Sequence, residues 1–281
     1  MNSDDKILYH YTSLEVFKCL FENYSKDNPN LIFWATNCTY MNDPKEITEG
    51  INLVRDILKN GLSEQFIQHA NFFLDEDLDE DFLRDDLLLE SAGSLSNIPY
   101  AVSFSKNADN LNMWRMYGDN GSGVALGFSR NKLRIPGTKL IKCIYNTESE
   151  IKEYKERILS EFTRLYSAIT PPPPRMPQEA YDYLMTLGPF CRFISEIKNK
   201  CYSYEQETRA IADCNVPKFR IQNGILKPYT EVKVPINALD RIIIGPTCSS
   251  SNLTSIKLLL RSKGLYELSK NILVSGVPYR N

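Results

Sequence analysis

The sequence has only two histidines, His10 and His69, among 281 residues. A zinc site built on histidines, or a mechanism that needs two of them, is therefore nearly excluded. The seven cysteines include no Cys-x-x-Cys pair, and their odd number argues for reduced thiols that pack as small core residues. We expect a protein that holds no metal ion.

Long apolar runs and an excess of one charge are also missing. No apolar stretch approaches the ~18 residues that a membrane span requires. Residues 1–6 have neither the basic nor the apolar region of a signal peptide, so we expect a cytoplasmic protein with no membrane association. The 33 basic and 35 acidic residues give a net charge of -2, which provides no global attraction to nucleic acid but permits a local basic groove.

The chain does have enough apolar residues for a substantial core, with 42% hydrophobic and 24% charged residues. Strand patterns occur near both ends, and helical patterns lie between them. This arrangement predicts a single α+β domain of residues 1–281, with a sheet assembled from distant segments and helical insertions at about 47–96 and 148–200. The predicted strands are 7–12, 31–36, 100–105, 124–128, 139–145, 202–212, 229–236, 241–245 and 272–277.

Two capping patterns predict where helices begin. Thr12 and Glu15 form a capping box directly after the first strand, and Asn42-Asp43-Pro44 predicts a second helix with Glu46 at its third position. Between residues 63 and 89 the period is helical but the surface is strongly acidic. A solvated insertion that covers a sheet edge is the favoured interpretation, and an acidic mimic of nucleic acid is the alternative.

Three groups of residues could carry chemistry. On a strand through 204–209, Glu205, Glu207 and Arg209 would share one face, where the two carboxylates repel each other unless Arg209 compensates them. An exposed ladder of charges is the commoner explanation of such a pattern. The lone His10 is, by itself, more often a hydrogen-bonded scaffold residue than a catalyst.

The third group is the segment 113–117 and the glycines that follow it. Trp114 and Tyr117 would share a helical face, as core residues or as a ligand platform, and the glycines at 118, 121 and 123 would allow a ligand to approach the backbone. The glycine pattern lacks the Lys-Ser/Thr of a P-loop, which argues against an NTPase.

Taken in order over residues 8–212, these segments resemble a widespread bacterial family built on a domain of unknown function. The layout of that family is similar to the ADP-ribosyltransferase superfamily, which has a histidine on the first strand, an aromatic residue in the middle and a glutamate on a late strand. The segments that carry the resemblance are His10-Tyr11-Thr12-Ser13, Met41-Asn42-Asp43-Pro44-x-Glu46, Phe104-Ser105, Met113-Trp114-x-x-Tyr117-Gly118, Gly123, Gly127-Phe128 and Tyr204-Glu205-x-Glu207-x-Arg209.

The resemblance implies a split mixed or antiparallel sheet with helical insertions, and NAD as the substrate. It implies that Glu207 is the catalytic carboxylate, with Glu205 two residues earlier. It implies that His10 binds the adenosine-side ribose of NAD, and that Tyr117 or Trp114 stacks on nicotinamide. The remaining residues that it assigns to NAD binding are Tyr11, Thr12, Ser105 and Arg209.

Cleavage of the nicotinamide glycosidic bond passes through an oxocarbenium-like state that a carboxylate stabilises, and it needs no metal. We therefore expect a protein that transfers ADP-ribose to a protein or nucleic-acid target or hydrolyses NAD, as a toxin or an anti-phage effector. If one dinucleotide is shared, His10 and Glu207 should open into one cleft at a separation of roughly 10 Å.

Two other functions are compatible with the same residues. A non-catalytic module of the same fold could sense a nucleotide derivative, with Glu205, Glu207 and Arg209 as a ligand clamp. Transfer of an RNA 2'-phosphate to NAD would call for more basic residues near His10 than Lys6 and Lys18 provide.

Overall fold

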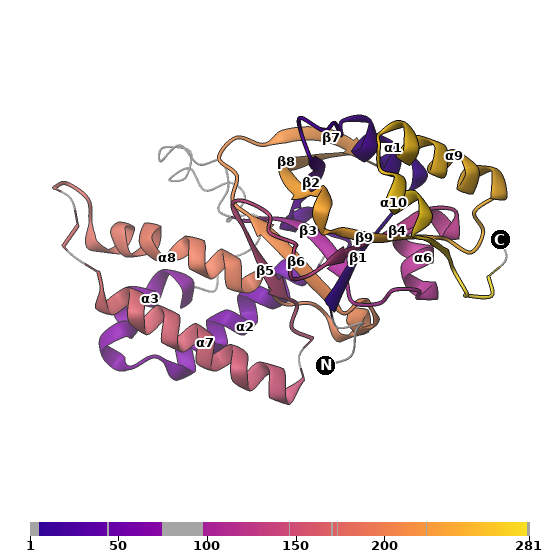
Figure 1. The fold of residues 1–281 in the computed structure, drawn as a ribbon. Coiled ribbons are helices and arrows are strands. Elements are labelled where there is room, and N and C mark those ends of the chain that lie inside the picture. Colours follow the sequence, from indigo (N-terminus) through magenta and orange to yellow (C-terminus); the bar gives the residue numbers. More distant parts are fainter. Residues whose placement is uncertain are drawn as a thin grey trace.

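A large mixed sheet lies beside a group of helices in the computed structural model (Figure 1). The structure describes residues 6–279 except 44, 75–97, 146, 170, 173 and 223. Within these residues the strand order is β10-β9-β4-β1-β3-β2-β8-β7, and β6 joins β3 to β5. The strands are β1 (Ile7–Thr12), β2 (Asn30–Asn37), β3 (Tyr100–Ser105), β4 (Val124–Ser129), β5 (Thr138–Lys142), β6 (Glu207–Ala212), β7 (Lys218–Gln222), β8 (Ile225–Pro235), β9 (Leu239–Ile244) and β10 (Ile272–Val274).

The described helices gather in two regions of the molecule (Figure 1). One group comprises α2 (Glu46–Gly61), α3 (Glu64–Leu74), α7 (Glu148–Ser167) and α8 (Gln178–Ile194). The other elements are α1 (Leu14–Glu22), α6 (Leu111–Tyr117), α9 (Ser250–Ser262) and α10 (Tyr266–Lys270), with short 3-10 helices at Cys38–Tyr40, Asp119–Gly121, Lys200–Glu205 and Ile236–Ala238. The sequence therefore predicted correctly that helical segments interrupt a sheet of distant strands.

Strand β3 is the branch point of the sheet. Along one edge it pairs with β6 over its whole length. Along the other edge it pairs with β1 only at Tyr9↔Ser105, and with β2 only at Thr36↔Ala101 and Asn37↔Tyr100. Strands β1 and β2 therefore diverge from the same edge of β3.

The pairing register defines two faces of the sheet, because residues directly opposite each other point to the same side. Tyr9, Ser105 and Glu207 form one row and belong to the face that we call the charged face. The neighbouring row belongs to what we call the aromatic face, where Phe104 packs with Phe33 and with α1 and α9. Helices α2, α3, α7 and α8 pack against the charged face.

Two predicted helices begin later in the chain than expected. Helix α1 begins one residue later than expected, because the Ser13 side chain accepts the hydrogen bond from the Val16 amide. Helix α2 begins at Glu46, with Lys45 as its N-cap, while the Asp43 carboxylate accepts from the Lys45 amide. Pro44 and the acidic stretch after residue 74 lie outside the described residues.

The predicted strand over residues 202–212 was wrong in its first half. Asn199 caps a 3-10 helix over Lys200–Glu205 by accepting from the Cys201 amide, and Gln206 is left-handed with φ of 43°. Strand β6 begins only at Glu207. The local hydrogen bond therefore outweighed the alternating pattern, and Glu205 does not share a strand with Glu207 and Arg209.

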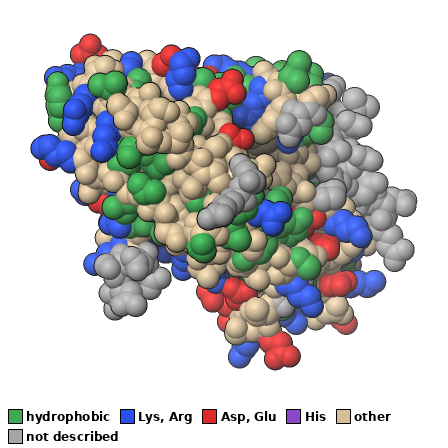
Figure 2. Space-filling model, turned by 90° about the vertical axis from the view of Figure 1, so that its right-hand side faces the viewer, with side chains coloured by type: hydrophobic (Ala, Val, Ile, Leu, Met, Phe, Trp, Pro, Cys, Tyr) green, Lys and Arg blue, Asp and Glu red, His purple; other side chains and the backbone are tan. Residues whose placement is uncertain are grey.

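On the face shown in Figure 2, basic, acidic and hydrophobic side chains are interspersed. No extended field of one sign is visible on that side of the molecule. In the part of the chain that the structure describes, no helix is long and apolar enough to cross a bilayer.

Candidate functional site

Five charged side chains from four segments meet beneath the charged face of the sheet. Each of them is at most 5% exposed. We call this group the buried charge cluster. It comprises Glu46 at the start of α2, Lys198 after α8, Glu205 at the end of a 3-10 helix, and Glu207 and Arg209 on β6. Burial of ions is costly unless they are paired, so the pairing within this cluster decides whether the fold tolerates it.

Glu207 occupies the centre of the cluster. Arg209 donates from Nε to Glu207 Oε1 at 3.0 Å and from Nη2 to Oε2 at 3.1 Å. Lys198 Nζ donates to Glu207 Oε2 at 2.5 Å and also to Glu205 Oε2. Both oxygens of Glu207 are therefore occupied by protein donors.

Arg209 also links β6 to two helical segments. Its Nη1 donates to the Ser195 carbonyl at 2.6 Å. The same atom lies 2.5 Å from Glu46 Oε1 in an ion pair, and among the described residues neither buried oxygen of Glu46 has a partner that meets hydrogen-bond geometry. Glu46 is therefore the least satisfied carboxylate of the cluster.

Three hydroxyl groups connect the cluster to neighbouring segments of the chain. Tyr117 donates to Glu205 Oε1 at 2.7 Å, and Tyr145 accepts from the Glu207 amide at 2.7 Å. Ser105 Oγ donates to the Glu205 carbonyl at 2.5 Å. Tyr117 is only partly buried, so it forms the solvent-facing end of the cluster beside Glu205.

The surroundings shift the pKa values of Glu207 and Glu46 in opposite directions. Burial by itself would raise the pKa of Glu207, but Arg209 and Lys198 outweigh it and hold that pKa well below its usual range. Burial raises the pKa of Glu46, because Arg209 compensates it only in part. Burial would lower the pKa of Lys198, yet the carboxylate of Glu207 raises it. With three carboxylates and two cations, the negative charge on Glu46 is the least stabilised.

The substitution Glu46→Gln tests this imbalance. The pKa of Glu46 is higher in the folded protein than in the unfolded chain, where it is about 4.5. As pH rises from about 4.5 through the folded-state pKa, ionisation of Glu46 therefore lowers the free energy of unfolding. We expect the variant to lie within about 1 kcal/mol of the wild type at pH 8, and its stability relative to the wild type to improve between pH 5 and pH 8. Urea unfolding at both pH values measures this, and a loss above roughly 3 kcal/mol at pH 8 would show that Arg209 needs Glu46 as its counter-ion.

His10 does not join the cluster. Its ring packs against Phe33 and Phe104 on the aromatic face, with centroid distances of 4.9 Å and 5.9 Å. Its Nδ1 lies 2.9 Å from the Ser103 carbonyl oxygen, at the place where β1 and β2 diverge from β3. Burial lowers the pKa of His10, which favours the neutral ring. His10 and Glu207 therefore point to opposite faces of the sheet, so the expectation that they open into one cleft is wrong.

The neighbours of His10 divide between the two faces. Thr12 is buried and alternates with Tyr11 along β1, so it shares the side of His10. Tyr11 lies on the other side and donates from its hydroxyl to the Asn107 carbonyl at 2.8 Å. Of these first-strand residues, only Tyr11 is on the face that carries Glu207.

The two candidate aromatic residues of α6 have different environments. Trp114 is fully buried, packs edge-on against Tyr11 and donates from Nε1 to Asp109 at 2.6 Å. It is a core residue, and its ring is not available for stacking on a ligand. Tyr117 is the aromatic residue that reaches Glu205.

Sequence reasoning missed Lys198 and the role of Glu46. It expected Arg209 to compensate both carboxylates of the Glu-x-Glu pair, whereas Arg209 binds Glu207 and Glu46, and Lys198 binds Glu205. Lys198 belongs to none of the quoted motifs. The sequence offered one indication of a second cation. If Glu205 and Glu207 are both buried, Arg209 alone cannot neutralise the two carboxylates.

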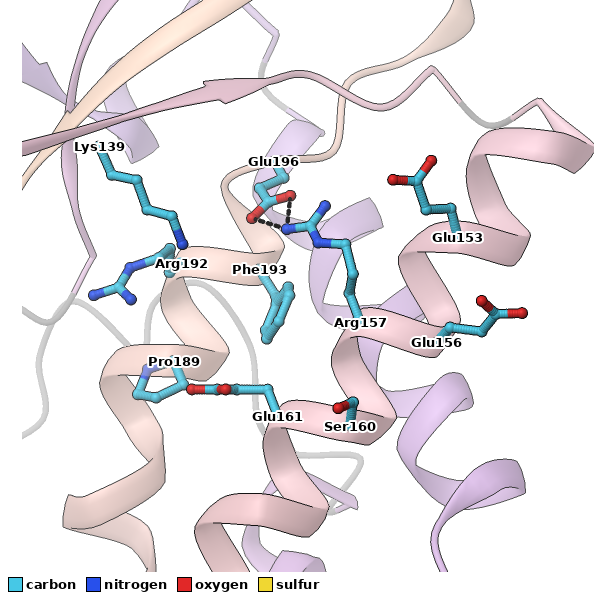
Figure 3. Close-up of a pocket in the computed structure, with 10 residues that line it drawn as sticks. All are labelled: Lys139, Glu153, Glu156, Arg157, Ser160, Glu161, Pro189, Arg192, Phe193 and Glu196. Carbon is cyan, nitrogen blue, oxygen red and sulfur yellow. Dashed lines mark hydrogen bonds and ion pairs between the residues drawn. The ribbon is translucent and has the colours of Figure 1, made fainter.

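A separate pocket of about 440 Å³ lies between α7 and α8 (Figure 3). Arg157 binds both oxygens of Glu196 across it, at 2.9 Å and 2.8 Å, and Lys139 lies on the opposite side from Glu153 and Glu156. No member of the buried charge cluster lines this pocket. Among the described residues, no three His, Cys, Asp or Glu side chains are arranged to hold a metal ion.

Comparison with known proteins finds a family model that matches part of the chain, and it gives no activity. Residues 113–210 match the family described as "Protein of unknown function (DUF2971)". This match supports a domain of unknown function. It includes Tyr117, Lys198, Glu205, Glu207 and Arg209, whereas Glu46 and His10 lie outside it. No curated protein and no solved structure matches the chain.

Proposed function

We propose that this chain is an ADP-ribosyltransferase-like protein that binds NAD and either transfers ADP-ribose to a macromolecular target or hydrolyses NAD. The observation that supports this most is the convergence of Ser105, Tyr117, Glu205 and Glu207 at the adjoining ends of β3 and β6. These residues come from three separate motifs of the chain. The divergence of β1 and β2 from one edge of β3 is compatible with a split sheet.

Within this proposal, Glu205 is the carboxylate that meets the nicotinamide ribose. It contacts the partly exposed Tyr117, whereas both oxygens of Glu207 are held by Lys198 and Arg209. A carboxylate at that position would stabilise the positive charge that develops when nicotinamide leaves. Glu207 would then position Lys198 and, through it, Glu205. Because Glu205 is 3% exposed, a substrate would reach it only after side chains that cover it move aside.

A second function is favoured by two specific observations. Both carboxylate oxygens of Glu207 accept hydrogen bonds from Lys198 and Arg209, and His10 lies on the opposite face of the sheet. Both fit a non-catalytic module of the same fold that binds a nucleotide derivative. Such a module would bind NAD or ADP-ribose without turnover.

The test is incubation with NAD labelled in the adenosine moiety, with and without cell extract, while released nicotinamide is measured. We expect the wild type to release nicotinamide, and Glu205→Gln to slow the release by about a hundredfold or more. Tyr117→Phe keeps the ring but loses the hydrogen bond to Glu205, and should show an intermediate rate. Glu207→Gln completes the set, with thermal unfolding to confirm that each variant folds.

The matched control is Glu161→Gln, the same change at a surface carboxylate that pairs with Arg164. It should keep the wild-type rate. If the wild type releases no nicotinamide but binds NAD or ADP-ribose in calorimetry, the chain is the binding module. If it neither binds nor cleaves NAD, both functions are wrong.

A further inference from the structure

The charged face continues beyond the cluster onto the outer strands β2, β8 and β7. Thr36 shares a row with Ala101 of β3 and with Tyr229 of β8, and Trp34 alternates with Phe33, which packs on the aromatic face. Trp34 therefore lies on the same side of the sheet as Glu207. Strand β7 is the last strand in the order and lies at the top of the molecule, away from α3 and α7 (Figure 1).

Two cations stand directly opposite each other on these outer strands. Arg220 of β7 pairs in register with Lys227 of β8, and like charges in such positions repel. Arg220 donates to Thr36 Oγ1 at 2.8 Å, and Lys227 donates to the Tyr40 carbonyl at 3.2 Å. Neither cation has an ion pair with a carboxylate within the described ranges, and the buried Nε of Arg220 has no hydrogen-bond partner there.

Among the described residues, no carboxylate pairs with the positive charge of Arg220 or of Lys227. Burial lowers the pKa of Arg220 and of Lys227, and the charge of Arg220 lowers that of Lys227 further. Glu231, the carboxylate of β8 on this face, is held by Lys218 at 2.8 Å. An arrangement that is unfavourable in isolation would be relieved by an anion bound between the two cations.

An aromatic platform adjoins this pair. Trp34 is 43% exposed and packs against Tyr229 with a centroid distance of 4.9 Å. The Arg220 guanidinium lies over both rings, at 5.4 Å from the centroid of Trp34 and 5.9 Å from that of Tyr229. Exposed aromatic rings beside basic side chains are the elements that proteins use to stack bases and bind phosphates.

We propose that Trp34, Tyr229, Arg220 and Lys227 form a nucleotide-binding subsite, in which a phosphate bridges Arg220 and Lys227 and a base packs on the exposed part of Trp34. This subsite lies outside the buried charge cluster and does not depend on the proposed function. A free nucleotide and one unit of a single-stranded nucleic acid present the same chemistry. Lys233, which shares this face with Lys227 and is exposed, would add to the attraction for a longer strand.

The subsite is tested by titrating the wild-type protein with adenosine monophosphate and with a fluorescein-labelled single-stranded oligonucleotide of eight residues. We expect Arg220→Gln, Lys227→Gln and Trp34→Ala each to weaken binding by about tenfold or more. Trp34→Phe keeps a stacking ring and should retain most of the affinity. Added salt should weaken binding, with a smaller salt dependence in the two cation variants.

The control is Lys270→Gln, which removes an exposed lysine on α10 and should leave binding unchanged. Much tighter binding of the oligonucleotide than of the mononucleotide identifies a nucleic acid as the ligand, and equal binding identifies a single nucleotide. If neither probe binds, or if the three variants bind like the wild type, the inference is wrong. Nicotinamide release is measured in parallel with Trp34→Ala, so that failure here is distinguished from failure of the proposed function.

Discussion

Arg209→Met is expected to lower the free energy of unfolding by about 3–5 kcal/mol. Arg209 is 1% exposed, and it carries the positive charge that faces both Glu207 and Glu46. Methionine fills much of the same space but leaves the three buried carboxylates Glu46, Glu205 and Glu207 with Lys198 as the remaining cation of the cluster. An unpaired buried charge is far more costly than the loss of an exposed ion pair. Urea unfolding at pH 7 measures the effect.

The matched control for this prediction is Arg164→Met on α7. Arg164 also makes paired hydrogen bonds to one glutamate, Glu161, but its side chain is 64% exposed. This change should cost less than about 1 kcal/mol. Combining Arg209→Met with Glu46→Gln should recover part of the loss, because it removes one of the two uncompensated charges. A cost for Arg209→Met equal to that of the control would contradict the burial argument.

Gly123→Ala is expected to destabilise the protein by about 3 kcal/mol. A β-carbon at this position would lie 2.9 Å from the Gly118 carbonyl oxygen and closer still to the carbonyl oxygen of Thr12. Both neighbours are backbone atoms of ordered elements, since Thr12 ends β1 and pairs with Val124. They cannot move as a flexible side chain could, so the strain has to be absorbed by the β1–β4 pair.

Gly276→Ala is the control, because the nearest atom to its new β-carbon is Asp109 Oδ2 at 3.8 Å, an ordinary contact. It should change the unfolding free energy by less than about 0.5 kcal/mol in urea titrations. A similar effect of both substitutions would show that the turn before β4 can relax. The space at Gly123 is filled by the protein's own backbone, so this glycine serves packing rather than the ligand approach that the sequence pattern suggested.

The local periodicity of the chain was sufficient to predict several elements of the fold. The alternation of residues 7–12 predicts β1, with Tyr9 and Tyr11 on the side opposite His10, as observed. The helical pattern within residues 148–200 predicts α7. These predictions succeed because the spacing of apolar side chains and the geometry of a strand or helix involve only neighbours in the sequence.

The sequence by itself also singled out residues that the fold brings together, because the Glu-x-Glu-x-Arg pattern and Tyr117 meet in one place. Only the tertiary structure decided which charges pair and which face each residue occupies. Lys198 contacts Glu205 and Glu207 because the chain returns to β6 after α8. Glu46 contacts Arg209 because α2 packs against the same face of the sheet. His10 is separated from Glu207 by the register Tyr9↔Ser105↔Glu207, which follows from the pairing of three distant strands. Alternation along one strand predicts that His10 and Tyr9 point to opposite faces of the sheet. Only the pairing of β1, β3 and β6 determines which of these faces carries Glu207.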